Sequence, residues 1–575
     1  MGETRVPAAP SGTATAGQRW MNLVFVLIPL LCVGLWTASL WGADPRQMRS
    51  LGLLDLLTPA SYVALGLLIL SFLAALYRER SDAILWLHLI GYVGIIHATA
   101  PILYGTVRYA WSYKHVGIVD YIIRHSGVNP QIAIGEIYHN WPGFFAGSAF
   151  LTELAGTQNA LIFASWSPFF FNLLNLLMIR FVFRRLTINR AQIWLGMLFF
   201  LLINWVGQDY FSPQALCFVL YIGLLGIMLY STVQRRMIWP FTIVAAAIAV
   251  SHQITPLMMV IAVAGLVVLR RVRGWYLPLI AVGLTAAWAL TGGLDYTLPN
   301  AEDLVSEMGN VINNTEQTLD KSSGLSGAAS MQVVWGGRIT VAISVLVALL
   351  GIWRHRRTGK TFITAALLMI LPGVLVVTTG FGGEVLFRAF LFATPFIAYL
   401  AAGVCLPRKG SRLTLKRTAA AGTIALLVLP GFLLGYFGKE SENYFTNNEV
   451  AASEWVYTHA ADDSLLAEGS SNYPGRFVDY EKFTYVPLSR EPEDSIQEFV
   501  DDPVAKLASW FNSPRYKEGY FLVTRSQEVA AERDGSLPPG SLEQIVNKLR
   551  ASDQFRIVYE NPDAVVFALA QGQGS

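Results

Sequence analysis

Residues 136–141 read Glu-Ile-Tyr-His-Asn-Trp, so acidic, aromatic, imidazole and amide side chains fall within six positions. They belong to a polar stretch, residues 105–159, that lies between long apolar runs, and Asp120 stands sixteen residues before Glu136. Two carboxylates in one stretch can divide a reaction between them, one as general base and the other as a ligand of substrate or metal. We interpret Asp120 and Glu136 as the catalytic residues; the alternative is that both are solvated loop acids.

Asp120 is the preferred base of the two. Residues 115–126 have apolar side chains at helical spacing, which predicts a helix along the membrane surface. Such a helix is a stiffer platform for a catalytic group than a loop. After the cluster, Pro142 and Gly143 predict a turn, and the aromatic side chains around it are expected at the bilayer interface. These side chains are Trp141, Phe144 and Phe145.

Further polar side chains stand at three short junctions between apolar runs, which read GQDYFSPQAL, SHQITP and FGGEVLFRAF. Ionisable groups beside a membrane are expensive and indicate function. Together with the stretch 105–159, the junctions supply the predicted substrate-binding residues: Lys114, His115, His139, Asn140, Trp141, Asp209, Tyr210, His252, Gln253, Glu384 and Arg388. Arg388 and His252 are expected to bind a phosphate, because a guanidinium group matches phosphate in a bidentate geometry.

Each junction also has a purely structural interpretation. Asp209 or Ser212 would cap the following helix. His252 would be a core histidine that donates to a backbone carbonyl. Glu384 and Arg388, four residues apart, would form an ion pair within one helix. The polar junctions all fall on one side of the predicted membrane, which favours a polar cavity open to that side.

The elements that must position these groups are membrane-spanning helices. The 575 residues are 54% hydrophobic and 14% charged, against about 25% charged in soluble proteins. A spanning helix needs about 20 mostly apolar residues. We predict a mainly α, polytopic bundle of about thirteen spans, with a small C-terminal extracytoplasmic α/β domain. The spans lie near residues 21–42, 60–77, 83–104, 160–183, 191–207, 213–233, 237–251, 255–270, 275–292, 338–353, 361–380, 387–406 and 418–437.

The distribution of charge gives the orientation, because Lys and Arg concentrate on the cytoplasmic side. With residues 1–20 as a disordered cytoplasmic segment, the inner stretches hold 22 basic residues and the outer stretches eight, up to residue 437. An odd number of spans then places residues 438–575 outside. From Lys439 on there are 23 acids and 12 bases. Patterning predicts strands at 518–524 and 555–569 and helices at 447–460 and 542–552.

Three other features of the sequence bear on the class of function that the protein can have. The cysteines, Cys32, Cys217 and Cys405, all fall in predicted spans, so the outer domain has no disulfide framework. The sequence contains no G-x-x-x-x-G-K-[ST] motif for a nucleotide phosphate. The outer loop 293–337 is acidic and rich in Ser and Gly; it is either a mobile lid over the cavity or a solvated loop.

This layout resembles the GT-C glycosyltransferases, through the stretches VDYIIRHSG, GEIYHNWPGFF, QDYFSPQAL, SHQITP and GGEVLFRAFLFATPF. The resemblance covers residues 21–437 and the outer domain. It implies a bacterial plasma (inner) membrane enzyme of cell-envelope polysaccharide biosynthesis. The enzyme would transfer a sugar, with inversion, from a polyprenyl-phosphate donor to an acceptor glycan, lipid or protein outside. Its partners would be these substrates and membrane lipids, without nucleic acid.

Two points stay open beside the resemblance. In many enzymes of this class the catalytic acid directly follows the first span, where this chain has Asp44 and Asp55, so Asp44 is a reserve candidate. No cofactor is certain, and a divalent metal, Mg²⁺ or Mn²⁺, is the alternative to basic side chains for binding phosphate. The other functions considered are a polysaccharide polymerase or ligase that uses lipid-linked sugars, and a polytopic transporter, which usually shows repeat symmetry.

Overall fold

The structure is a computed structural model of the chain. It describes residues 16–132, 135–230, 235–302, 306, 309–312, 314–316, 328–355, 360–379, 383–407 and 412–570. Of the loop 293–337, which the sequence predicts to lie outside, the described part is limited to residues 293–302, 306, 309–312, 314–316 and 328–337. The prediction of a lid in that loop therefore falls mostly outside the described residues.

Seven helical segments among the described residues are long and apolar enough to cross a membrane. They are α1 (Ala16–Ser39), α2 (Pro59–Tyr77), α8 (Leu161–Leu186), α17 (Ala328–His355), the segment Thr361–Thr378 that includes most of α18 (Lys360–Ile370), α20 (Val385–Val404) and α21 (Leu415–Phe437). Six shorter apolar helices are α3 (Asp82–His97), α9 (Arg190–Ile203), α10 (Pro213–Met228), α11 (Ile238–Ser251), α12 (Thr255–Val268) and α13 (Tyr276–Ala289). Each coincides with one predicted span, so the polytopic helical fold is confirmed.

Local sequence signals explain where several helices begin. The Ser212 side chain accepts from the amide of Ala215 and Pro213 occupies the first turn of α10, which confirms Ser212 as the cap. Asn189 caps α9 in the same way. Small residues allow close packing inside the bundle: a Cβ at Gly351 of α17 would lie 2.0 Å from the Leu400 carbonyl of α20.

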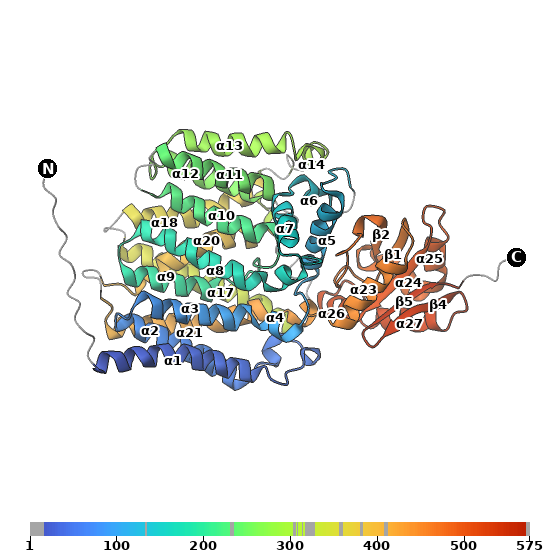
Figure 1. Ribbon diagram of the computed structural model, residues 1–575, viewed down its shortest axis with the longest axis horizontal. Helices are drawn as coiled ribbons and strands as arrows, with labels where there is room; N and C mark the ends of the chain where they lie inside the picture. The colour runs from blue at the N-terminus through green and yellow to red at the C-terminus, as the bar shows by residue number, and fades with distance from the viewer. Residues whose placement is uncertain are drawn as a thin grey trace.

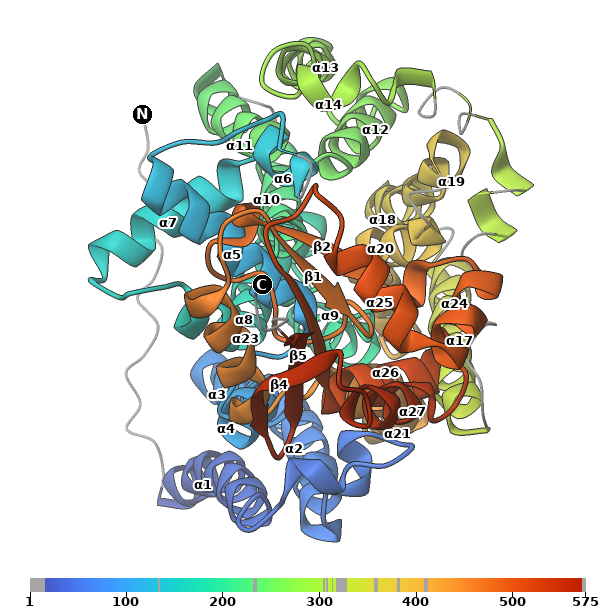
Figure 2. The same ribbon diagram turned by 90° about the vertical axis from the view of Figure 1, so that its right-hand side faces the viewer.

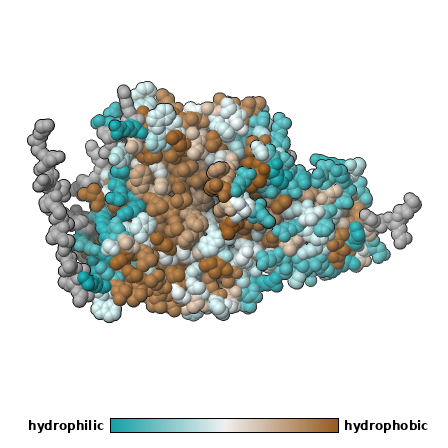
Figure 3. Space-filling model, in the orientation of Figure 1, coloured by the Kyte–Doolittle hydropathy of each residue, from teal (hydrophilic) through white to brown (hydrophobic). Residues whose placement is uncertain are grey.

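The helices lie side by side, and the N-terminal end of α1 and the C-terminal domain stand at opposite ends of the helical body (Figure 1). On the face shown in Figure 3, apolar residues gather over the middle of the helical body, and hydrophilic residues gather at its two ends and over the C-terminal domain. This polarity is that of a multi-pass membrane protein whose two ends face water.

The C-terminal domain contains a five-stranded sheet in the order β2-β1-β3-β5-β4. The strands are β1 (Ser464–Glu468), β2 (Phe483–Pro487), β3 (Gly519–Thr524), β4 (Phe555–Asn561) and β5 (Ala564–Leu569). β1 runs parallel to β2 and β3, while β5 is antiparallel to β3 and β4. The α/β class and the last three strands are confirmed, whereas β1 and β2 were not predicted.

Helices cover the two faces of this sheet. The predicted helices are present as α23 (Asn447–His459) and α27 (Ser541–Arg550). α24 (Glu493–Asp501), α25 (Pro503–Phe511) and α26 (Arg525–Asp534) were not predicted. α24, α25 and α27 share one apolar core with the sheet, and α23 packs on the other face.

A layer of three helices lies between the bundle and the C-terminal domain: α5 (Ala110–His125), α6 (Glu136–Asn140) and α7 (Gly143–Leu154) (Figures 1 and 2). The helix expected at 115–126 is thus present within α5. It does not lie exposed on the membrane surface, however, because residues 112–119 are all buried, partly under aromatic side chains of the C-terminal domain. This middle layer carries most of the predicted site.

Candidate functional site

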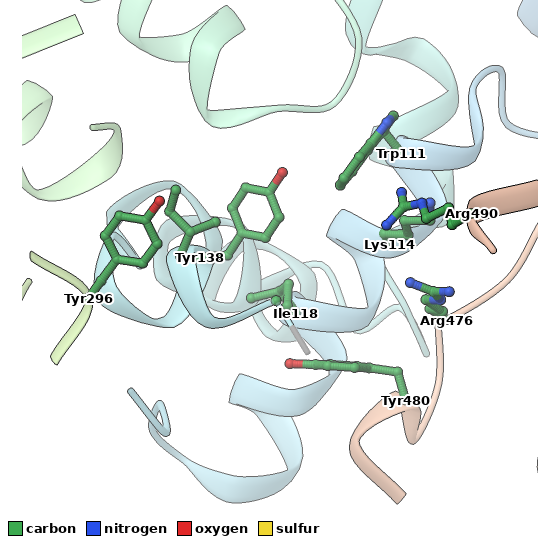
Figure 4. Close-up of a pocket in the computed structure, with 10 residues that line it drawn as sticks. Trp111, Lys114, Ile118, Tyr138, Tyr296, Arg476, Tyr480 and Arg490 are labelled. Carbon is green, nitrogen blue, oxygen red and sulfur yellow. The ribbon is translucent and has the colours of Figure 1, made fainter. Parts of the chain in front are cut away.

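A cavity of about 420 Å³ opens where the middle layer meets the C-terminal domain. Its lining residues come from α5, from α6 and the glycine before it, from the short helix α14 (Leu294–Thr297), and from two segments of the C-terminal domain. They are Trp111, Lys114, Ile118, Gly135, Ile137, Tyr138, Tyr296, Arg476, Tyr480 and Arg490. Figure 4 shows the three cations gathered on one side, with Tyr138 and Tyr296 across from them.

Lys114 is the cation that the membrane domain supplies. Its side chain is mostly buried, and its Nζ donates to the Ser471 carbonyl at 3.2 Å and lies 4.4 Å from the Trp111 ring centre. Burial, and then the nearby charge of Arg476, lower the pKa of Lys114 to about 7. An anion entering the cavity would therefore meet a lysine that gains its proton readily on binding.

Arg476 is held firmly by the C-terminal domain. Its Nη2 donates to both carboxylate oxygens of the fully buried Glu468, at 3.2 and 3.0 Å, and its guanidinium lies 4.4 Å from the Tyr485 ring centre. The Arg476 backbone has φ +65°, a conformation that non-glycine residues rarely adopt, and its amide donates to the Tyr457 hydroxyl. Strained backbone of this kind often occurs at functional sites.

The Arg476 loop touches α5 at Gly117. A Cβ at Gly117 would lie 1.9 Å from the Arg476 carbonyl oxygen, so only glycine permits this approach. The contact stands one helical turn from Lys114 and brings the lysine and the arginine to the same cavity. Arg490 reaches the cavity from the end of η7 (Leu488–Arg490); it is exposed and forms no ion pair with any other described residue.

The motif at 136–141 forms one wall of the cavity, and hydrogen bonds from its polar side chains hold that wall in place. The buried His139 bonds the Tyr480 hydroxyl through Nε2 and accepts from the Asn129 amide through Nδ1. Burial lowers the pKa of His139 to about 4, so the ring is neutral. Asn140 donates to the Pro130 carbonyl and accepts from the Tyr296 amide. His139 and Asn140 thus position two of the aromatic lining residues.

The expected position of the aromatic side chains after this motif is wrong. Trp141, Phe144 and Phe145 are 8%, 5% and 0% exposed, so they are buried in the protein and do not face the bilayer interface. Trp141 packs edge-on against Tyr296, with ring centres 5.6 Å apart. Burial among other aromatic rings outweighs the interfacial preference, because Tyr296 packs on Trp141, Phe211 packs on Phe144, and His115 and Tyr138 pack on Phe145.

The two predicted catalytic carboxylates have different surroundings. Glu136 is the first residue of α6, and its neighbours Gly135 and Ile137 line the cavity. The Glu136 side chain lies outside what the structure describes. Asp120 does not line the cavity; its carboxylate accepts from Arg124 at 2.8 Å and from the Asp479 amide at 3.3 Å. Burial raises the pKa of Asp120, against the opposing effect of Arg124.

Arg124 extends this contact into a bridge between the two domains. Its guanidinium also donates to both carboxylate oxygens of Glu481, at 2.7 and 3.0 Å, and it pairs with Asp479. Asp120 therefore belongs to an ion-pair network that joins α5 to the loop carrying Tyr480.

Two of the short junctions converge behind Tyr138. The buried His115 donates from Nδ1 to the Phe211 carbonyl at 2.6 Å, stacks on Tyr210 with ring centres 5.8 Å apart, and meets Tyr138 edge-on at 4.8 Å. Burial lowers the pKa of His115 to about 4. Arg388 pairs with Glu384 and donates to Gln208, both at 2.8 Å. The intrahelical pair expected of Glu384 and Arg388 is thus present.

The buried His252 side chain lies at the start of the next helix, and Gln253, which follows it, is half-buried. The His252 Nδ1 accepts from the amides of Ile254 and Thr255 at 3.2 Å, so this ring nitrogen is an acceptor for α12 and does not donate to a carbonyl. The Nε2 then carries the proton.

Asp209 is buried away from the cavity. Its Oδ2 accepts from Asn172 at 2.7 Å and from the Tyr436 hydroxyl at 2.9 Å, and it lies 3.0 Å from His97 Nδ1. Asp44 does not line the cavity either. Its side chain caps a short helical turn by accepting a hydrogen bond from the Arg46 amide. The structure therefore brings Lys114 to the cavity directly and places Asp209 in a buried network of the bundle.

The cations and aromatic rings that line the cavity suit an anionic ligand. Within the described part of the chain, no group of three or more His, Cys, Asp or Glu residues could hold a metal ion. The described side chains that line the cavity are basic, aromatic or aliphatic. Hard divalent cations prefer oxygen ligands, which this set supplies only as tyrosine hydroxyls.

Comparison with known proteins gives matches to solved structures. ArnT from Cupriavidus metallidurans bound to undecaprenyl phosphate matches with 10% identity over 84% of this chain and 98% of that chain, at a TM-score of 0.46. The oligosaccharyltransferase of Archaeoglobus fulgidus, tethered to an acceptor peptide, matches with 10% identity over 89% of this chain and 74% of that chain, at a TM-score of 0.45. The apo state of the same ArnT matches with 12% identity and a TM-score of 0.46, over 85% of this chain and 98% of that one.

No protein-family model matches the chain, and no curated protein matches it either. At 10–12% identity and TM-scores below 0.5, the matched structures carry no argument about the function of this chain or about its individual residues. The chemistry of the site follows from the cavity of this chain.

Proposed function

We propose that the protein is a membrane glycosyltransferase that moves a sugar from a polyprenyl-phosphate donor to an acceptor glycan, lipid or protein. The reaction would take place on the outer face of a bacterial plasma membrane. One observation carries the proposal: a cavity with basic side chains and aromatic walls stands at the end of a multi-pass helical bundle. A lipid-linked donor can keep its chain in the bilayer and present its sugar phosphate there.

The size and walls of the cavity support a sugar as the transferred group. About 420 Å³ is within the range of small-molecule sites, which runs from about 300 to 1,000 Å³. Trp111, Tyr138, Tyr296 and Tyr480 provide flat rings and hydroxyl groups. Such side chains present an apolar body with a polar edge, which suits a pyranose ring that has both kinds of surface.

The reaction would be a single displacement with inversion. An acceptor hydroxyl forms a bond to the anomeric carbon, the bond from that carbon to the phosphate oxygen breaks, and the phosphate leaves with the electron pair. The hydroxyl proton passes to a carboxylate. Basic side chains stabilise the negative charge on the departing phosphate. A bound Mg²⁺ or Mn²⁺ would supply the same charge stabilisation, but the lining offers it few ligands.

Glu136 is the carboxylate we assign as base. Its two chain neighbours line the cavity, whereas Asp120 is engaged with Arg124 between the domains. In this proposal the roles expected from the sequence are divided differently: Glu136 takes the proton, and Asp120 holds the wall in place. General base catalysis contributes about 10²–10⁴-fold to a rate.

The test is a transfer assay with the purified full-length protein in proteoliposomes, using radiolabelled polyprenyl-phosphate sugars and membrane-derived acceptors. Glu136→Gln is expected to lower transfer by about 10²–10⁴-fold while donor binding stays the same. Glu153→Gln is the matched control, because Glu153 is an exposed acid of the neighbouring α7. Full activity of Glu136→Gln would remove Glu136 from the mechanism. A wild-type protein that transfers sugar from none of the lipid-linked donors would refute the transferase itself.

A further inference from the structure

The topology of the C-terminal domain predicts where it binds a ligand. β1 lies between its parallel neighbours β2 and β3, so the chain leaves β1 toward one side for β2 and returns on the other side for β3. In open α/β sheets, ligands bind outside the carboxyl ends of the parallel strands at such a reversal of strand order. The carboxyl ends of β1, β2 and β3 share one edge of the sheet.

The cavity is located at this edge. β1 ends at Glu468, and the loop that follows carries Arg476. β2 ends at Pro487, and the next turn ends at Arg490. Both arginines line the cavity together with Lys114 of α5. Strand topology and cavity lining are independent observations, and they select the same loops.

We propose that Arg476 and Arg490 complete, with Lys114, a phosphate-binding site that is formed only when the C-terminal domain is docked on the middle layer. This inference rests on the proposed function and names the group that the cavity binds: the phosphate of the lipid-linked donor. The C-terminal domain is then part of the active site and not an appended module.

The geometry of the two arginines fits this role. Glu468 occupies Nη2 of Arg476 and fixes the guanidinium plane, while Nη1 forms no hydrogen bond with any other described residue. Glu468 is therefore a positioning residue. Arg490 is exposed and free of ion pairs within the described chain, so its charge is available. With Glu468 counted, the three cations leave a net charge of about +2 when Lys114 is protonated. This charge exceeds the single negative charge of the donor's phosphodiester and matches the phosphate monoester that is released from it.

Three contacts keep the loops docked on the middle layer. Arg124 of α5 binds both carboxylate oxygens of Glu481, the Tyr480 hydroxyl bonds His139, and Gly117 lets the Arg476 carbonyl approach α5. All three fix the same short segment of the C-terminal domain, residues 476–481, which begins at Arg476 and precedes Arg490. The segment cannot leave α5 without separating Arg476 from Lys114.

The experiment measures binding to the full-length protein in detergent micelles. The probes are a short-chain polyprenyl phosphate, the corresponding polyprenol without phosphate, and inorganic phosphate. The variants are Arg476→Gln, Arg490→Gln and the double variant. Arg515→Gln is the matched control, because Arg515 is an exposed arginine of the same domain that precedes β3 and so stands near the opposite edge of the sheet.

Each single variant is expected to lose about ten- to a hundredfold in affinity for polyprenyl phosphate, the cost of one charge-assisted hydrogen bond. The double variant should lose more, while Arg515→Gln and polyprenol binding stay unchanged. Wild-type affinity in the double variant would overturn the inference. Inorganic phosphate that binds as tightly as the lipid phosphate would refute the assignment to a lipid-linked donor.

The outcomes also separate this inference from the proposed function. Loss of phosphate binding in a protein whose wild type transfers no sugar would leave the site standing and refute the transferase. Normal transfer and normal phosphate affinity in both arginine variants would refute the phosphate site and leave the transferase standing. Thermal unfolding of each variant checks folding, and Arg490→Gln alone decides the matter if Arg476→Gln unfolds, because Arg490 is exposed and forms no ion pair within the described residues.

Discussion

Gly117→Ala tests whether the close approach of α5 and the Arg476 loop assembles the site. The added Cβ would lie 1.9 Å from the Arg476 carbonyl oxygen, whereas ordinary contact begins at 3.4 Å. The two segments must therefore separate by roughly 1.5 Å. The carbonyl cannot simply rotate away, because the Arg476 amide is bonded to Tyr457 and its φ is already +65°. Arg476 must move away from Lys114 with its loop.

The expected effect on stability is small compared with the effect on function. Overpacking costs about 1–3 kcal/mol, and replacing glycine by alanine within a helix offsets about 0.5–1 kcal/mol of it. A misplacement of about 1 Å in a positioning contact can lower activity by about 10²-fold. We expect Gly117→Ala to lose about 10²-fold in polyprenyl-phosphate affinity and sugar transfer, with a loss of about 0–2.5 kcal/mol in the free energy of unfolding.

The matched control is Gly147→Ala. Gly147 lies in α7 of the same layer, and a Cβ there would meet no atom within 4 Å. This variant gains helix propensity without any clash, so it should bind and transfer like the wild type. Affinity and transfer are measured side by side for both variants, with thermal unfolding as the stability readout. If Gly117→Ala binds donor as well as Gly147→Ala does, the close approach has no part in forming the site.

Two further predictions concern charge. Because the pKa of Lys114 in the free protein is about 7 and binding of an anion favours its protonated form, affinity for polyprenyl phosphate should fall about tenfold between pH 7 and 8.5. Lys114→Arg should flatten this dependence; a pH profile identical to that of the wild type would contradict it. Asp120→Asn should lower the stability of domain docking, measured by limited proteolysis, and reduce transfer by less than tenfold, since Asp120 pairs with Arg124 and does not line the cavity. A loss of 10²-fold or more, with docking intact, would restore Asp120 as the base.

The sequence predicted the fold where one physical rule dominates. The length of an apolar run determines whether it can span a membrane. All thirteen predicted spans coincide with apolar helices of the structure. In the C-terminal domain, β4 and β5 were predicted because two long β-branched and aromatic runs flank an Asn-Pro-Asp turn. β1 and β2 have five residues each and adjoin polar loops. Their pairing depends on partners far away in the sequence, so local pattern could not find them.

The sequence predicted only part of the candidate site, because local pattern cannot show which residues far apart in the sequence come together. The motif at 136–141 forms a wall of the cavity and Lys114 lines it, as a dense polar cluster beside a membrane suggested. Arg476 and Arg490 were missed because each stands more than 350 residues after Lys114 and reads as an ordinary loop arginine. One local signal was available: Gly117 interrupts an otherwise well-formed helix, and a glycine there indicates a close approach by another backbone.

The charge of the C-terminal domain makes the position of its arginines informative. The domain has 23 acids against 12 bases, so an arbitrary surface of it would repel a phosphate. The loops that meet the cavity nevertheless present two arginines, and Glu468, the acid that pairs with Arg476, is fully buried. A ligand that contacts both domains must favour docking by the same free energy with which docking favours the ligand. Donor binding and domain docking are then one coupled equilibrium, and the acidic remainder of the domain confines phosphate to the edge where Lys114 completes the site.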